Sequence, residues 1–200
     1  MSRPSGVLLA GGASRRFGRP KVVEPFDGAP LFHRPLRALI DSCDEIVIVL
    51  APDAPELPLP EGSDRVAFAR DSVAYEGPLA GARVGLECVH REYAVLVAAD
   101  MPGVTSRLLA LMGERAAGNH RNAIVLADAD GMRPLPAVLM VTPALALART
   151  LLEKGERRLR ALVEGLDADG LPQAVWGQAD ANGEWRRDVN LPDDLGETAP

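Results

Sequence analysis

Short runs of apolar residues recur along the chain, separated by more polar stretches. Several of these runs are continuous rather than alternating, which is typical of strands that are buried on both faces of a parallel sheet. The pattern therefore predicts strands over residues 7–9, 46–50, 66–69, 94–99, 123–127 and 137–141.

The stretches between these runs carry apolar residues at helical spacing. Within residues 31–40, 79–89 and 108–112, apolar side chains recur so that they share one face of a helix. Two further short helices are expected at about 144–152 and 157–164, followed by an irregular end. Strands that alternate with helices predict an α/β, doubly wound fold, and we expect residues 1–200 to form a single domain.

One connection breaks the alternation. Residues 128–131 join the runs at 123–127 and 137–141 and leave no room for a helix between them. These two runs are therefore expected to form a hairpin. The predicted sheet is mixed, mostly parallel with one antiparallel element.

Composition and charge narrow the possible classes of protein. Hydrophobic residues make up 47% of 200 residues, which is enough for one domain with a sizeable core, and the net charge of −6 argues against a nucleic-acid partner. Cys43 and Cys88 form no Cys-x-x-Cys pair, so neither a zinc site nor a disulfide framework is indicated. No apolar stretch approaches the roughly eighteen residues of a membrane span, and no leader pattern opens the chain. We expect a cytoplasmic protein with no membrane contact.

The chemistry-bearing part of the chain begins after the first predicted strand. Leu9, Ala10, Gly11 and Gly12 run into a loop of small residues, which is followed by two adjacent arginines and then Lys21. Backbone N–H groups in such a loop can approach an anion closely, and the cations add positive charge around the same point. A nucleotide phosphate suits this loop. An ordinary strand-to-helix turn flanked by solvated arginines is the alternative interpretation of the glycines alone.

This loop differs from two better-known phosphate-binding motifs. Val22 follows Lys21, so the chain lacks G-x-x-x-x-G-K-[ST], and it also lacks G-x-G-x-x-G. The sequence therefore predicts neither a P-loop nor a standard dinucleotide-binding turn.

Asp100 is the best candidate for a metal ligand. It ends the apolar run at 94–99, so its carboxylate and the glycine loop are both expected at the carboxyl ends of the strands, where open α/β sheets bind ligands. Mg²⁺ is commonly held by one or two carboxylates, with phosphates and water completing its shell. Capping of the next helix is the alternative role, but Thr105 is better placed for it. Asp71 follows another strand, and an Asp-Ser pair at such a place is by itself typical of a turn.

Several segments together resemble one family. The string LAGG-x-SRR-x-G-x-x-K at 9–21 is similar to the signature loop of the molybdenum cofactor guanylyltransferases, which are MobA-like nucleotidyltransferases. Matching segments follow in order: RDS at 70–72, EGPLAG at 76–81, AADMP at 98–102, GERR at 155–158 and VNLPD at 189–193. The resemblance covers nearly the whole chain and implies a Rossmann-like nucleotidyltransferase fold.

The resemblance also implies an activity and a set of site residues. The expected reaction is Mg²⁺-dependent transfer of GMP from GTP to Mo-molybdopterin, which forms the guanine dinucleotide cofactor and pyrophosphate. The expected catalytic residues are Arg16, Lys21 and Asp100, and the expected metal ligands are Asp100 and Asn190. The residues expected to bind the nucleotide are Leu9, Ala10, Gly11, Gly12, Lys21, Asp71, Gly77, Pro78, Leu79 and Asp100. Partner proteins would be molybdoenzymes or other proteins of cofactor synthesis.

Two departures from the family pattern bear on the expected function. Asp188 stands where the family has an asparagine, and it could either add a carboxylate to the ion or belong to an ordinary helix start. Arg133-Pro134 replaces the usual His-Pro before the second strand of the hairpin. The change to Arg133-Pro134 is compatible with nucleotidyl transfer but leaves the identity of the acceptor open.

Two other functions stay open at this point. The same chemistry could use CTP or another phosphorylated acceptor, although the cytidylyl relatives tend to have Leu-Ala-Ala-Gly where this chain has Leu-Ala-Gly-Gly. Alternatively, the protein could be a catalytically silent, nucleotide-binding partner in molybdoenzyme assembly. The presence of both Lys21 and Asp100 argues against a silent protein.

Overall fold

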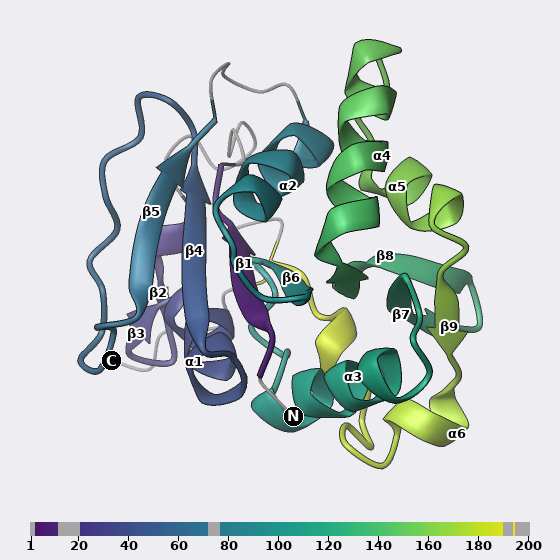
Figure 1. Ribbon diagram of the computed structural model, residues 1–200. Helices are drawn as coiled ribbons and strands as arrows, with labels where there is room; N and C mark the ends of the chain where they lie inside the picture. Colours follow the sequence, from purple (N-terminus) through teal and green to yellow (C-terminus); the bar gives the residue numbers. More distant parts are fainter. Residues whose placement is uncertain (1–2, 12–20, 72–76, 190–193, 195–200) are drawn as a thin grey trace.

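The computed structural model describes residues 3–11, 21–71, 77–189 and 194, and its centre is a seven-stranded sheet in the order β5-β4-β1-β6-β8-β7-β9 (Figure 1). The strands are β1 (Ser5–Leu9), β4 (Glu45–Leu50), β5 (Val66–Arg70), β6 (Tyr93–Ala98), β7 (Ala123–Asp128), β8 (Gly131–Met140) and β9 (Asp169–Leu171). Strand β8 runs antiparallel to both neighbours, whereas the other paired strands are parallel. A mixed, mostly parallel sheet and the hairpin of β7 and β8 are therefore confirmed.

Helices cover both faces of this sheet. They are α1 (His33–Ser42), α2 (Pro78–Glu87), α3 (Ser106–Gly118), α4 (Val141–Glu153), α5 (Leu159–Gly165) and α6 (Gln173–Trp176), with 3₁₀ turns at Lys21–Val23 and Glu184–Arg186. A separate two-stranded hairpin, β2 (Pro25–Phe26) and β3 (Ala29–Pro30), precedes α1. No helix in the described ranges combines the length and the apolar content that a membrane crossing requires.

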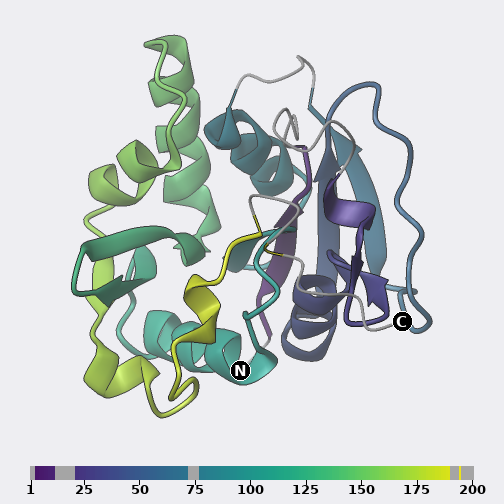
Figure 2. The ribbon, with the colours of Figure 1, turned by 180° about the vertical axis from the view of Figure 1, so that it is seen from behind.

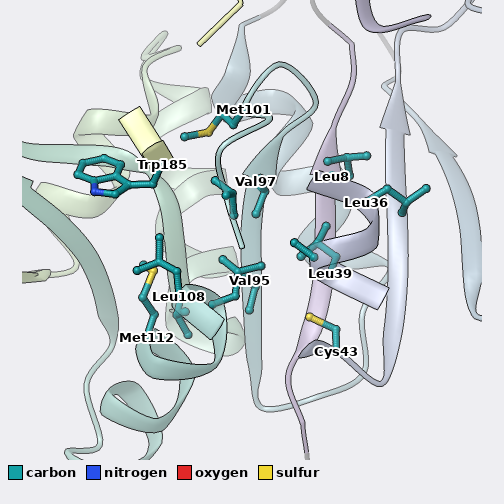
Figure 3. Packing of buried hydrophobic residues seen from close by; sticks show 14 of the residues in the cluster. Leu8, Leu36, Leu39, Cys43, Val95, Val97, Met101, Leu108, Met112 and Trp185 are labelled. Atoms are coloured by element: carbon teal, nitrogen blue, oxygen red, sulfur yellow. The ribbon is translucent and has the colours of Figure 1, made fainter. Parts of the chain in front are cut away.

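Two apolar cores lie on opposite faces of the sheet. On one face, α1 and α3 pack against alternate strand residues such as Leu8 and Val95, and Figure 3 shows this cluster with Trp185 at its edge. On the other face, α2, α4 and α5 pack against the intervening residues, such as Val7 and Leu96. Since successive side chains of a strand point to opposite faces, continuous apolar runs are what two covered faces require.

Two predictions for the C-terminal part of the chain were wrong: the end of the strand expected at 137–141 and the irregular segment expected after the last helix. Val141 was expected to end a strand, but it opens α4, and its N–H donates to Glu92 O at 2.8 Å. The irregular end expected after α5 instead contains β9, which adds a parallel edge strand to β7, and then α6. With only three residues, Asp169 to Leu171, β9 offers no apolar run from which it could be predicted.

Backbone hydrogen bonds hold the strand ends together at one rim of the sheet. The N–H of Ala10 donates to Val49 O at 2.9 Å, and the N–H of Ala99 donates to Leu9 O at 3.0 Å. The N–H of Asp71 donates to Leu50 O at 2.9 Å. The chain that follows β1, β5 and β6 is therefore tied to the same edge of the sheet.

Candidate active site

Lys21 and Asp100 meet at this rim, although 79 residues separate them in sequence. Lys21 Nζ donates to Asp100 Oδ2 at 2.5 Å and to the carbonyl oxygen of Val189 at 2.9 Å. The Val189 N–H in turn donates to Asp100 O at 3.0 Å. The Lys21 and Asp100 side chains are only 15% and 23% exposed, so three distant segments converge on one sheltered ion pair.

Local packing explains how these segments reach the rim. The chain between Lys21 and α1 folds back on itself, because Leu31 N–H donates to Glu24 O and Phe32 N–H donates to Val22 O. A small buried cluster of Phe26, Leu31 and Val189 joins this stretch to the C-terminal segment. That segment runs along the face of the sheet that α1 and α3 cover (Figure 2).

The alternative role of Asp100 as a helix cap is excluded. Thr105 is the N-cap residue of α3, and its Oγ1 accepts a hydrogen bond from Leu108 N at 3.3 Å. The carboxylate of Asp100 therefore serves the rim rather than a helix end.

A second carboxylate lies close to Asp100. The pKa of Asp188 is raised to about 6. The larger cause is the partial burial of its carboxyl group, although the residue as a whole is exposed, and the smaller cause is the negative charge of the nearby Asp100. Charge from Lys21 and Arg133 acts in the opposite direction. Two carboxyl groups that oppose each other's ionisation form an environment that a cation would stabilise.

These oxygens fit a divalent cation of the Mg²⁺ type. Hard cations take oxygen ligands, and Mg²⁺ commonly uses one or two carboxylates while phosphates and water fill the remaining positions. Within the described ranges, no cluster of three or more His, Cys, Asp or Glu side chains forms a closed metal cage. Asp100 and Asp188 thus match an open site that a substrate completes. Asn190, the other expected ligand, lies outside the described residues.

The glycine loop is described only at its beginning. Gly11 lies against the end of β4, where a methyl group on its Cα would be 3.3 Å from Ala51 N. Leu9 and Ala10 are partly buried at the end of β1. Gly12 and Arg16 lie outside the described residues. A methyl group at Gly11 would therefore fit only tightly against this backbone.

Asp71 has an unsatisfied oxygen at the same rim. Its Oδ1 is buried and accepts no hydrogen bond from the part of the chain that the structure describes. A buried acceptor without a partner is unfavourable by about 1–3 kcal/mol, so a hydroxyl or amide donor from a ligand would stabilise it. This observation favours a ligand contact over a simple turn.

Gly77 lies where two segments of the family resemblance, the one that opens α2 and the one at 155–158, contact each other. Its φ of +97° is a conformation that glycine adopts readily, and a Cβ there would lie 2.9 Å from Arg157 O. The Leu79 N–H donates to the same carbonyl at 3.2 Å, and Pro78 occupies the first turn of α2. The pKa of Glu156 is lowered to about 2, because its carboxylate accepts hydrogen bonds from Arg158 and from the Arg157 N–H. The segments at 77–81 and 155–158 are therefore adjacent in space.

A cavity of about 330 Å³ opens beside Asp100. It lies on the β6 and β8 side of the rim. Gly11 follows β1, Asp71 follows β5 and Gly77 directly precedes α2, so these three residues belong to the other side. The cavity is lined by Ala98, Asp100, Met101, Arg133, Pro134, Leu135, Trp185, Arg186 and Asp188. Neither Trp185 nor Arg186 was expected in the site, although both lie shortly before the segment at 189–193 that carries part of the family resemblance.

Comparison with known proteins agrees with this geometry. Residues 6–170 match the family model of the MobA-like NTP transferase domain. The probable molybdenum cofactor guanylyltransferase of Haloferax mediterranei is 31% identical over 96% of this chain and 90% of its own.

Two solved structures share the fold. The molybdopterin-guanine dinucleotide biosynthesis protein A of Archaeoglobus fulgidus superimposes with a TM-score of 0.76 at 22% identity, over 96% of this chain and 94% of that one. The 2-C-methyl-D-erythritol 4-phosphate cytidylyltransferase of Thermus thermophilus gives 0.68 at 17% identity, over 94% of each chain. The fold is therefore shared by proteins named for different nucleotides. Together with the matched family model and the related sequence, the site identifies this chain as a nucleotidyltransferase that belongs to the MobA-like molybdenum cofactor guanylyltransferase family.

Proposed function

We propose that this protein transfers GMP from GTP to the phosphate of Mo-molybdopterin, with Mg²⁺ bound, and releases pyrophosphate. The observation that carries the proposal is the contact of Lys21 with Asp100 at the rim, beside the first glycine of the loop and the cavity. The name of the Haloferax relative supports guanylyl transfer for the present chain. We also propose that the protein acts in the cytoplasm, with cofactor-synthesis proteins or molybdoenzymes as partners.

The chemistry needs positioning and charge rather than a protein nucleophile. An oxygen of the acceptor phosphate attacks the α-phosphorus of GTP, the bond from this phosphorus to the bridging oxygen breaks, and pyrophosphate leaves with the electron pair. Negative charge develops on the phosphoryl oxygens and on the leaving group. Lys21 supplies an ammonium group where this charge develops, and we propose that Arg16 supplies a second cation.

Asp100 and Asp188 would hold the metal ion, with Asn190 as the further expected ligand. A divalent cation held there would supply positive charge to neutralise the phosphates. Asp100 also holds Lys21 Nζ at 2.5 Å, so this one carboxylate positions both the cation of the chain and the metal site.

The nucleoside part of GTP would lie over the β1, β4 and β5 half of the rim. We propose that backbone groups of Leu9, Ala10, Gly11 and Gly12 approach the nucleotide, and that Asp71 Oδ1 accepts a hydrogen bond from its ribose or base. Gly77, Pro78 and Leu79 would border the same space, since they open α2 beside this half of the sheet.

A nucleotide screen tests this proposal. The protein is incubated with molybdopterin, Mg²⁺ and each of the four ribonucleoside triphosphates in turn, and pyrophosphate release is measured. GTP should be the best substrate. Faster release with CTP would assign the chain to the cytidylyl type, and GTP binding without release from any triphosphate would indicate a silent binding protein.

A further inference from the structure

We infer that the cavity beside Asp100 is the acceptor site, and that Arg133 and Arg186 bind the anionic phosphate of the acceptor. This inference deepens the proposed function and rests on it for the identity of the reaction. It concerns a different half of the rim from the nucleotide.

The position of the cavity is the first argument. Asp100 belongs both to the ion pair with Lys21 and to the wall of the cavity. Strand β6, which Asp100 follows, lies between β1 on the loop side and β8 on the cavity side. A molecule in the cavity would therefore reach the reaction centre from the side opposite to the glycine loop, as the attacking partner of a displacement reaction must.

The charges in the cavity are the second argument. Asp100 and Asp188 place negative charge in the wall of the cavity, and an acceptor phosphate would bring more. Cations elsewhere in the wall would therefore favour the binding of such an acceptor. Arg133 and Arg186 are the cations in that wall. A guanidinium group presents several donors in a fixed plane that matches phosphate oxygens, which makes arginine well suited to this role.

Arg133 is held in place while part of its guanidinium group stays available. Its Nε donates to Asp128 Oδ2 at 3.1 Å and its Nη2 to Asp130 Oδ2 at 3.1 Å, whereas Nη1 donates to none of the described residues. The side chain is 43% exposed. The two aspartates of the β7–β8 hairpin thus orient a guanidinium group that still has donors for a ligand.

Arg186 and Trp185 complete this wall. Arg186 Nε donates to Gly183 O at 3.3 Å, and its guanidinium carbon lies 5.6 Å from the centre of the Trp176 ring. Trp185 is 1% exposed, yet its buried Nε1 has no hydrogen-bond partner in the described part of the chain. Trp185 also belongs to the apolar core, so its ring holds the Arg186 segment against the sheet at the edge of the cavity.

The size and the remaining wall indicate the class of ligand. About 330 Å³ lies at the lower end of the range for small-molecule sites, which is roughly 300–1,000 Å³. Met101, Pro134, Leu135 and the Trp185 ring add apolar surface to the wall of the cavity. The cavity therefore fits a phosphate monoester with a compact, partly apolar body.

A phosphate titration tests the site without depending on turnover. Inorganic phosphate is added to the nucleotide-free protein, and tryptophan fluorescence is recorded, since Trp185 lines the cavity. A saturating change is expected in the wild type. Arg133→Ala and Arg186→Ala should each weaken phosphate binding about tenfold or more, which is the effect of losing one charged hydrogen bond. Equal phosphate affinity in the wild type and in both variants would overturn the inference.

Matched controls separate binding from hairpin stability. Asp130→Ala removes one ion pair of Arg133 but keeps its guanidinium group, so phosphate affinity should remain. If Asp130→Ala weakens phosphate binding as much as Arg133→Ala does, Arg133 acts only through the hairpin and the inference fails. Arg160→Ala changes an exposed arginine of α5 that pairs with Glu164, and it should have no effect.

Steady-state kinetics connect the site to the reaction. Arg133→Ala and Arg186→Ala should raise KM for molybdopterin about tenfold or more and leave KM for GTP unchanged. A rise in KM for GTP alone would overturn the acceptor assignment. If no nucleotidyl transfer is found in the wild type, the proposed function fails, but arginine-dependent phosphate binding would still show the anion site.

Discussion

Replacing Lys21 by methionine removes the ammonium group from the reaction centre and keeps most of the apolar stem. Its hydrogen bonds to the described residues disappear, one to Asp100 at 2.5 Å and one to Val189 O at 2.9 Å. Breaking a fully buried ion pair costs about 3–5 kcal/mol, and an exposed pair is worth about 0–1 kcal/mol. Because the two side chains retain 15% and 23% exposure, we expect Lys21→Met to lower the free energy of unfolding by about 2 kcal/mol.

Urea unfolding measures this loss, and Lys154→Met is the matched control. Lys154 is exposed at the C-terminal end of α4, so the same substitution should change stability there by less than about 0.5 kcal/mol. In the double variant Lys21→Met/Asp100→Asn, the two losses should not add, because each single change breaks the same pair. Strictly additive losses would refute an energetic link between Lys21 and Asp100.

The same substitution should also weaken GTP binding. If Lys21 contacts a phosphate, losing that contact costs about 1.5–3 kcal/mol, which corresponds to roughly tenfold to 150-fold weaker binding. Calorimetry with GTP measures this effect. Unchanged affinity together with an unchanged rate of pyrophosphate release would remove Lys21 from the proposed catalytic machinery.

Three further substitutions test other parts of the structure. Gly103→Ala should destabilise the protein by about 1–3 kcal/mol, because the new Cβ would overlap Glu184 O, and urea unfolding that matches the wild type would contradict this packing. The low pKa of Glu156, about 2, stabilises the fold above pH 4.5, and this contribution is lost as the pH falls from 4.5 towards 2. Thermal unfolding of Glu156→Gln should therefore depend less on pH in that window, and an unaltered dependence would argue against the contact with Arg158. Gly11→Ala should narrow or reverse the preference for GTP over CTP, measured as a ratio of kcat/KM values, and an unchanged ratio would argue against this role of Gly11.

Much of the fold could be predicted from the sequence because its strands are buried on both faces. The continuous apolar run before Asp100 marked both a central strand and the position of the carboxylate at its end. The hairpin of β7 and β8 followed from the short connection between two such runs. By contrast, β9 is short and contains Asp169 and Gly170, so its place in the sheet depends on pairing with β7 rather than on its own pattern.

The candidate site could be predicted only in part, for a related reason. Lys21 and Asp100 were both expected at the strand ends, but the sequence could not show that Val189 O completes the contact of Lys21. Trp185 and Arg186 reach the cavity through a 3₁₀ turn whose position depends on tertiary packing. The spacing of apolar and polar residues within one segment does not indicate which distant segments will contact each other.

The most direct test of the central claim is the rate of Mg²⁺-dependent pyrophosphate release from GTP and molybdopterin in the wild type and in Asp100→Asn. This change keeps the shape of the side chain and removes the charge that we assign to the metal site and to Lys21. The account predicts GTP-dependent release by the wild type and a loss of about a hundredfold or more in the variant, which corresponds to about 3 kcal/mol of transition-state stabilisation. Circular dichroism should show that the variant is folded. Release by folded Asp100→Asn at close to the wild-type rate would contradict the assignment of this rim as the nucleotidyl-transfer centre.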